Sequence, residues 1–311
     1  MNLRPLGQSP LHVSSLAYGG WRLAGSEGSP AATTSQPGIR AIQAAVEAGF
    51  TFFDFADIYG GGRCESIFGE ALRESPDLRS RLIIATKCGI RRPADPTPDA
   101  PYRYDSSREH LISSVEGSIK RMGIEQIDLL MLHRPDYLMD PTEVAGAFYD
   151  LRQAGKVREF GVSNFRPSQL TALQKACPWP LSVQQVEISL LKTDTLDDGT
   201  LDQCLTEGIT PMAWSPLARG ALVQEPEGMP ELASAPRVAV GRVLEELAHQ
   251  YGVSRGVIAL AWLMKHPARI LPIIGSANPD RIAELARSGS ISLSREEWYR
   301  LLEASRGGRL P

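Results

Sequence analysis

Short apolar runs alternate with amphipathic stretches along most of the chain. The runs are rich in β-branched and aromatic residues, as in 51–53 (TFF) and 81–87 (RLIIATK), which is typical of strands covered on both faces. Strands are predicted to begin at about Ser14, Thr51, Arg81, Ile127, Val157, Leu181, Ile209 and Ile270. Most of these runs are followed by apolar residues at helical spacing. Eight such units predict an α/β fold, a closed (β/α)8 barrel rather than an open doubly wound sheet.

Capping signals and breaks in the pattern predict the remaining elements. Ser106, with Glu109 three residues later, has the pattern of a capping box that opens a helix. Asn278-Pro279 and Ser294 with Glu297 predict two further helix starts, and helices are expected over 237–251 and 254–266. A hairpin is predicted over residues 3–13. Loops are predicted over 24–36, over 91–104 and from the residue after 214 as far as 236. No linker divides the chain, so 1–311 is expected to be one domain.

Composition narrows the range of functions. The 311 residues are 42% hydrophobic and 22% charged with a net charge of −3, and no basic run draws the chain to nucleic acid or an anionic membrane. No run approaches the ~20 apolar residues of a spanning helix. The first residues lack the apolar segment of a secretory signal, so a cytoplasmic location is expected. The four cysteines share no CxxC spacing and are predicted to be free thiols, and the five histidines show no metal-binding spacing.

Polar residues stand where the predicted strands end, which is where barrels place their active sites. Asp54 ends the second strand, and Tyr59 follows on a glycine-flanked loop. Lys87 ends the third strand and His133 the fourth. Lys87 is expected to pair with Asp54 and to lower the pKa of Tyr59 toward the working range, so that Tyr59 exchanges a proton with a developing alkoxide. His133 could donate a hydrogen bond to the same oxygen. The alternative is a purely structural ion pair with an ordinary core histidine.

Seven stretches carry a resemblance to a known family, in order and at matching spacing. They are 53–60 (FDFADIYG), 84–87 (IATK), 127–136 (IDLLMLHRPD), 161–165 (GVSNF), 185–187 (QVE), 214–220 (WSPLARG) and 275–278 (GSAN). Through them the chain resembles the aldo-keto reductases over essentially its whole length. It looks most like bacterial cytoplasmic members, which share the strand end 87–90 (KCGI). The resemblance implies a TIM barrel whose bottom is closed by the N-terminal hairpin, with extra C-terminal helices.

The resemblance also implies roles for individual residues. Tyr59 becomes the general acid/base, Asp54 and Lys87 its tuning pair, and His133 the orienting donor. Cofactor contacts are implied for Gly20, Trp21, Ser163, Asn164, Gln185, Trp214, Ser215, Leu217, Arg219, Gly275, Ser276 and Arg281. Among these, Ser163, Asn164 and Gln185 match positions that bind the nicotinamide carboxamide, Trp214 matches the aromatic that stacks on its ring, and Ser215, Leu217 and Arg219 match the pyrophosphate loop.

NADPH is the predicted cofactor, because Arg281 matches the arginine that meets the 2′-phosphate. Gly275 stands where the family often has a lysine, so the preference over NADH is expected to be narrower. The predicted function is NADPH-dependent reduction of a small aldehyde or ketone. A monomer is a plausible oligomeric state. The alternative is a regulatory protein that keeps the fold and cofactor with little turnover. An aromatic substrate pocket is predicted from Trp21, Tyr102 and Tyr104. The alternative for the two tyrosines is packing on the surface.

Overall fold

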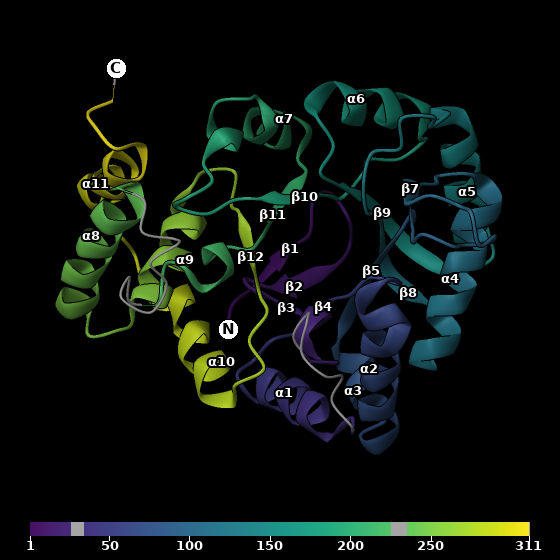
Figure 1. The fold of residues 1–311 in the computed structure, drawn as a ribbon, viewed down its shortest axis with the longest axis horizontal. Helices are drawn as coiled ribbons and strands as arrows, with labels where there is room; N and C mark the ends of the chain where they lie inside the picture. The colour runs from purple at the N-terminus through teal and green to yellow at the C-terminus, as the bar shows by residue number, and fades with distance from the viewer. Residues whose placement is uncertain (26–33, 225–234, 311) are drawn as a thin grey trace.

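Eight parallel strands form a closed barrel in the centre of the molecule (Figure 1). This computed structural model describes residues 1–25, 34–224 and 235–310. The barrel strands are β3 (Ala17–Gly19), β4 (Phe52–Asp54), β5 (Ile83–Cys88), β8 (Ile127–Leu132), β9 (Val157–Ser163), β10 (Val183–Glu187), β11 (Thr210–Trp214) and β12 (Leu271–Ile274). They pair in chain order, and β12 pairs with β3 to close the ring. The predicted barrel is confirmed.

Helices surround the barrel and bury their apolar faces against it (Figure 1). They are α1 (Gln36–Glu47), α2 (Arg63–Glu74), α3 (Leu78–Arg81), α4 (Arg108–Met122), α5 (Pro141–Gln153), α6 (Pro167–Ala176), α7 (Thr200–Glu207), α8 (Ala235–Tyr251), α9 (Arg255–Lys265), α10 (Pro279–Ala286) and α11 (Arg295–Arg306). The extra C-terminal helices are confirmed, since α8 and α11 lie side by side outside the ring. Trp262 of α9 stacks on Trp298 of α11, and each indole N–H donates to the other's carbonyl at 3.0 Å.

An N-terminal hairpin closes the amino end of the barrel. Its strands β1 (Leu3–Pro5) and β2 (His12–Ser14) pair antiparallel, and Leu6, at the turn, is fully buried in the same cluster as the inward-facing strand residues. The Gly7 N–H donates to Thr210 Oγ1 at 2.8 Å. Gly7 has φ of +57°, and a Cβ there would stand 2.5 Å from the Ser182 carbonyl oxygen, so glycine is required. The open end is therefore the one formed by the carboxyl ends of the strands.

Most strand starts differ from prediction by one or two residues, and two differ for a clear reason. Ser14 belongs to β2, where it pairs with Leu3, so the first barrel strand begins only at Ala17. Arg81 ends the short helix α3, and β5 begins at Ile83. The predicted starts at Ile127 and Val157 are confirmed.

One predicted helix cap is wrong. Ser107, not Ser106, caps α4, and its side chain accepts from the His110 N–H. Ser106 is engaged elsewhere, because its N–H and hydroxyl both donate to Asp136 Oδ2, at 2.9 and 3.0 Å. The caps at Asn278 and Ser294 are confirmed.

The predicted loops are only partly irregular. The 91–104 segment contains two short paired strands, β6 (Ile90–Arg91) and β7 (Arg103–Tyr104). The loops at 24–36 and after 214 include residues 26–33 and 225–234, which lie outside the described residues. All four cysteines are free, as predicted, and all four are buried. Among the described helices, none is long and apolar enough to cross a membrane.

Candidate active site

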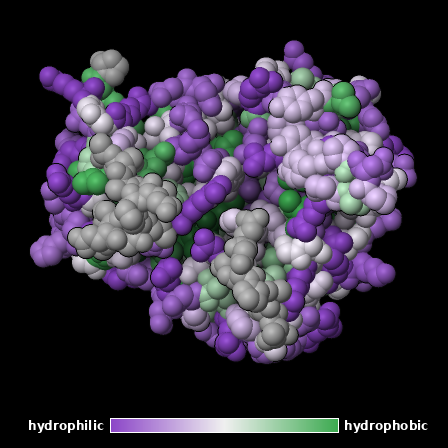
Figure 2. All heavy atoms as spheres, viewed as in Figure 1, coloured by the Kyte–Doolittle hydropathy of each residue, from purple (hydrophilic) through white to green (hydrophobic). Residues whose placement is uncertain are grey.

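A cavity of about 810 Å³ opens at the carboxyl ends of the barrel strands. Asp54 from β4, His133 just after β8, Gln185 from β10 and Trp214 from β11 all contribute to its wall. Figure 2 shows a hollow near the middle of this face of the molecule. Residues that are far apart in the sequence therefore converge, as expected for a barrel of this kind.

A buried ion pair lies below the cavity. Lys87 Nζ is 2.7 Å from both carboxylate oxygens of Asp54, and the two residues are 0% and 3% exposed. Gln185 Nε2 donates a further hydrogen bond to Asp54 Oδ1 at 3.1 Å. Burial lowers the pKa of Lys87, but the Asp54 carboxylate and the Tyr59 phenol more than offset this, and the pKa lies above its ordinary value. Lys87 is consequently charged at neutral pH.

Tyr59 stands next to this ion pair on the turn between β4 and α2. The turn passes through three left-handed residues, Gly60, Gly61 and Gly62, with φ of 58°, 66° and 88°. Lys87 Nζ lies 5.2 Å from the centre of the Tyr59 ring. Burial nevertheless raises the pKa of Tyr59, and the opposing effect of Lys87 is smaller. The predicted net lowering of this pKa is wrong, and Tyr59 is a protonated phenol at neutral pH.

His133 faces Tyr59 across the floor of the cavity. The two ring centres are 5.8 Å apart and the rings meet edge to face at 77°. Burial, then the charges of Lys87 and Arg134, hold the pKa of His133 well below its ordinary value, so the imidazole is neutral. Its buried Nδ1 has no hydrogen-bond partner in the described part of the chain. A neutral imidazole keeps one N–H to donate, as an orienting donor requires.

Three residues predicted to meet the nicotinamide form a hydrogen-bonded group beside the acid/base residues. Trp214 Nε1 donates to Asn164 Oδ1 at 3.0 Å. Asn164 Nδ2 donates to Ser163 Oγ at 2.8 Å and to the His133 carbonyl at 3.3 Å. Asn164 has φ of 60°, a conformation that Asn tolerates better than most residues. These bonds fix the Trp214 ring relative to His133.

The loop after β11 makes a tight turn at the other end of the cavity. Ser215, Ala218 and Arg219 have φ of 50°, 48° and 56°, and Gly220 follows with 100°. Two of the N–H groups of this turn are engaged within it, because those of Ala218 and Gly220 donate to the Ser215 and Leu217 carbonyls at 2.8 and 2.9 Å. The side chains of Leu217 and Arg219 also line the cavity.

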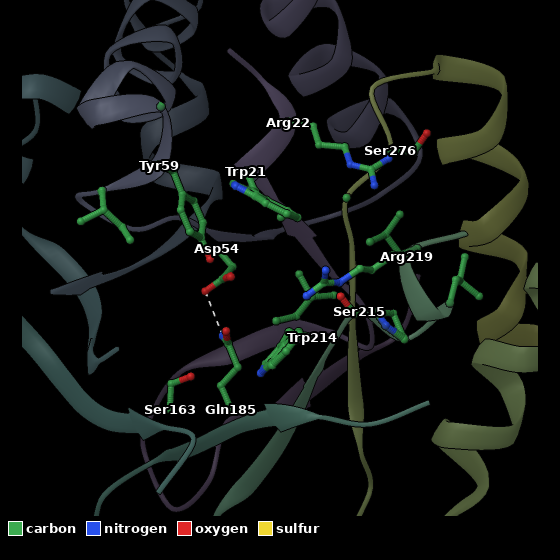
Figure 3. A pocket seen from close by; sticks show the side chains of 18 of the residues that line it. Trp21, Arg22, Asp54, Tyr59, Ser163, Gln185, Trp214, Ser215, Arg219 and Ser276 are labelled. Atoms are coloured by element: carbon green, nitrogen blue, oxygen red, sulfur yellow. Dashed lines mark hydrogen bonds between the residues drawn. The ribbon is translucent and has the colours of Figure 1, made fainter. Parts of the chain in front are cut away.

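The segment between β12 and α10 completes this end. Ser276 is held in place by the Tyr18 hydroxyl, which donates to its carbonyl at 2.9 Å. Asn278 caps α10, and its Oδ1 accepts from the Arg281 N–H at 3.0 Å. Gly275 and the exposed Arg281 line the cavity as well. Figure 3 shows Arg22, Arg219, Ser215 and Ser276 around one end, with Tyr59, Trp21, Asp54 and Gln185 at the other.

Some predicted residues stand back from the cavity. Lys87 lies behind Asp54 and Tyr59 and is not part of the wall. Gly20 is not part of it either, and a Cβ there would stand 2.3 Å from the Phe55 ring. Gly20 therefore serves close packing in this structure. Of the three candidate aromatic residues, Trp21 and Tyr102 line the cavity and Tyr104 does not.

Positive charge dominates the wall to a degree that the sequence did not reveal. The lining includes the arginines Arg22, Arg92, Arg134, Arg219 and Arg281. Asp54 is the one carboxylate among the lining residues described, and Lys87 neutralises it. Arg22, Arg92 and Arg134 are site residues that were not predicted from the sequence. Arg22 and Arg134 directly follow Trp21 and His133 in the sequence. Their position next to two predicted site residues could have identified them. Such a wall suits an anionic ligand.

Comparisons with known proteins identify the family. The model of the aldo/keto reductase family matches residues 15–306. The chain is 42% identical to 6-dehydroglucose reductase of Novosphingobium aromaticivorans over 314 aligned residues, covering 99% of this chain and 97% of the relative. It is 39% identical to 6-dehydroglucose reductase of Agrobacterium fabrum, covering 94% of each. The solved glycerol dehydrogenase of Gluconobacter oxydans superposes with a TM-score of 0.84 at 26% identity, covering 97% of this chain and 94% of that one. The chain belongs to the aldo/keto reductase family, whose members are oxidoreductases that act on carbonyl groups.

Proposed function

We propose that this protein reduces an aldehyde or ketone to an alcohol with NADPH. The observation that carries the proposal is the arrangement below the cavity: the buried Lys87–Asp54 ion pair adjoins the Tyr59 phenol, and the neutral His133 imidazole faces it. These are the groups that a carbonyl oxygen needs as it gains negative charge, namely a proton donor, a hydrogen-bond donor and a nearby positive charge.

The residues present fit a dinucleotide. The cavity volume lies within the range of small-molecule sites. Polar groups for a carboxamide are offered beside the Trp214 ring by Ser163, Asn164 and Gln185. In the loop after β11, Arg219 offers a guanidinium for a phosphate. When bound, the reduced nicotinamide supplies the hydride.

The protein's own residues then handle the proton. Tyr59 is protonated at neutral pH and donates its proton to the carbonyl oxygen. The positive charge of Lys87 stabilises the phenolate that remains, and Asp54 holds Lys87 in place. His133 donates a hydrogen bond to the same oxygen and orients the carbonyl.

Oxidation of NADPH, followed by absorbance against a panel of aldehydes, ketones and dicarbonyls, tests the proposal. Two relatives are named 6-dehydroglucose reductase, so sugar aldehydes with the carbonyl at C6 belong first in the panel. Turnover of at least one carbonyl is expected. A flat panel from a protein that still binds NADPH would favour the regulatory alternative.

Arg281→Ala is expected to weaken NADPH binding by about ten- to a hundredfold, the range for a hydrogen bond to a charged group. Arg281 lies in the first turn of α10 and lines the cavity, where its planar guanidinium can hold a 2′-phosphate with two hydrogen bonds. NADH has no such phosphate, so its affinity should change far less. Fluorescence titration with both cofactors measures the two dissociation constants.

Arg287→Ala is the matched control, because Arg287 is an exposed arginine at the other end of α10 and outside the cavity. It should leave both affinities unchanged. Equal losses of NADPH and NADH affinity in Arg281→Ala would show that Arg281 serves the adenine or the loop, and the NADPH assignment would lose its main residue.

A further inference from the structure

Three tyrosine side chains lead from the cavity onto the outer surface. Tyr102 lines the cavity and is 54% exposed. Its ring meets Tyr104 edge to face with centres 6.0 Å apart. Tyr104 stacks on Tyr137 at 6.4 Å with an interplanar angle of 22°, and Tyr137 is 87% exposed. We call Tyr102, Tyr104 and Tyr137 the tyrosine rim.

Hydrogen bonds hold the backbone that carries Tyr104 and Tyr137. Tyr104 belongs to β7 and pairs with Ile90 of β6, so its backbone is part of a small sheet. The loop that carries Tyr137 is tied to the start of α4, since the Ser106 N–H and hydroxyl both donate to Asp136 Oδ2. The other oxygen of Asp136 accepts from the Leu138 N–H at 2.9 Å. A ligand that used these rings would therefore need little ordering of the backbone that carries them.

Apolar ring faces that lie together in contact with water can mark a site where a ligand or a partner binds. Leu138, beside Tyr137, is 92% exposed. Flat faces favour a flat or ring-shaped group, and burying them removes apolar area from water. The setting is also polar, because the rim carries phenol hydroxyls and the Arg134 charge lies close enough to act on Tyr102. A ring that combines a C–H face with hydroxyl groups matches both properties.

We propose that the tyrosine rim is a subsite for a second sugar ring of the substrate. The inference rests on the proposed reductase function and extends it: the carbonyl belongs to a sugar ring in the cavity, and a glycosidically linked ring lies on Tyr104 and Tyr137. The shared wall at Tyr102 makes the two sites continuous. The chemistry is unchanged, with hydride added to the carbonyl carbon and the Tyr59 proton to its oxygen. The glycosidic bond stays intact.

Two aldehydes test the subsite directly. One is methyl glucoside oxidised to the aldehyde at C6, and the other carries the same aldehyde ring with a second glucose at C1. The wild-type protein is expected to reduce the second with a kcat/KM about tenfold higher, equivalent to about 1.4 kcal/mol. Tyr137→Ala should abolish most of that preference and leave the methyl glucoside aldehyde within about twofold of wild type.

Tyr149→Ala is the matched control. Tyr149 is 50% exposed on α5 and stacks on Trp179 at 6.3 Å, outside the cavity. It should leave the preference intact. Equal kcat/KM for the two aldehydes in the wild type, or equal losses for both in Tyr137→Ala, would overturn the subsite. So would a change of oligomeric state in Tyr137→Ala by sedimentation, because the rim would then be an interface between copies.

The subsite and the reductase function fail in different ways. If the wild-type protein reduces other carbonyls but neither sugar aldehyde, the subsite is wrong and the reductase function stands. If it reduces no carbonyl while binding NADPH, the proposed function itself is wrong.

Discussion

Tyr59→Phe is expected to lower kcat/KM for carbonyl reduction by at least the ~10²-fold typical of general acid catalysis. The substitution removes the phenol proton and keeps the ring. The ring would keep its contacts with His133, at 5.8 Å between centres, and with Trp21, at 6.4 Å. Stability and NADPH affinity should therefore change little, and the loss should appear in the chemical step.

Steady-state kinetics on a reduced carbonyl, with NADPH titration alongside, provide the measurement. Tyr149→Phe is the matched control, because it removes the hydroxyl of a half-exposed tyrosine outside the cavity and keeps its ring, which stacks on Trp179. The control should retain activity. A purified Tyr59→Phe protein that stays within a few-fold of wild type would show that Tyr59 is not the proton donor.

Lys87→Met is expected to impair both stability and catalysis. The methionine fills most of the volume but leaves Asp54 buried at 3% exposure without its cation. Breaking a buried ion pair from one side costs about 3–5 kcal/mol. Urea unfolding should show a loss of that size. Activity should fall as well, because the phenolate formed on Tyr59 loses the positive charge that stabilises it.

The pH dependence separates the catalytic role of Lys87 from its structural one. Tyr59 already has a pKa above its ordinary value, so reduction should be flat near neutral pH and decline only in strongly alkaline solution. Lys87 acts to lower that pKa, and its removal should move the alkaline decline to still higher pH. A pH–rate profile on a substrate whose chemical step limits turnover shows the shift.

The double variant Asp54→Asn/Lys87→Met is the control for this interpretation. It removes both charges, so it should recover part of the lost unfolding free energy without recovering activity. Recovery of activity together with stability would mean that the ion pair is structural only. An unshifted profile in an active Lys87→Met protein would likewise contradict the tuning role.

The barrel could be predicted because strands covered on both faces leave continuous apolar runs. Ile127 and Val157 begin such runs abruptly, and their predicted positions are correct. Ser14 was misplaced because the hairpin strand and the first barrel strand follow each other almost without a break. The spacing predicts a cap at Ser106 because a local pattern cannot reveal Asp136, which lies 30 residues away and accepts from both the N–H and the hydroxyl of Ser106.

The residues of the candidate site could be predicted better than their electrostatics. Asp54, Tyr59, Lys87 and His133 stand at strand ends, and the fold brings them together. Their roles remain predictions. The direction of the Tyr59 pKa shift was wrong because a single charged neighbour can be read from the sequence, whereas burial depends on every surrounding element. The tyrosine rim likewise depends on Tyr137, whose loop meets the 91–104 segment only in the folded chain.

The hairpin that closes the amino end of the barrel also constrains the sequence of kinetic events. With that end filled by Leu6, Leu11 and Val13, cofactor and substrate must share one entrance. The deeper ligand must then arrive first and leave last. Ser163 and Gln185, which are predicted to meet the nicotinamide, are 1% and 2% exposed, whereas Tyr102 of the tyrosine rim is 54% exposed. Binding is thus expected to be ordered, with NADPH entering first and NADP⁺ leaving last, and initial-rate product-inhibition patterns would reveal that order.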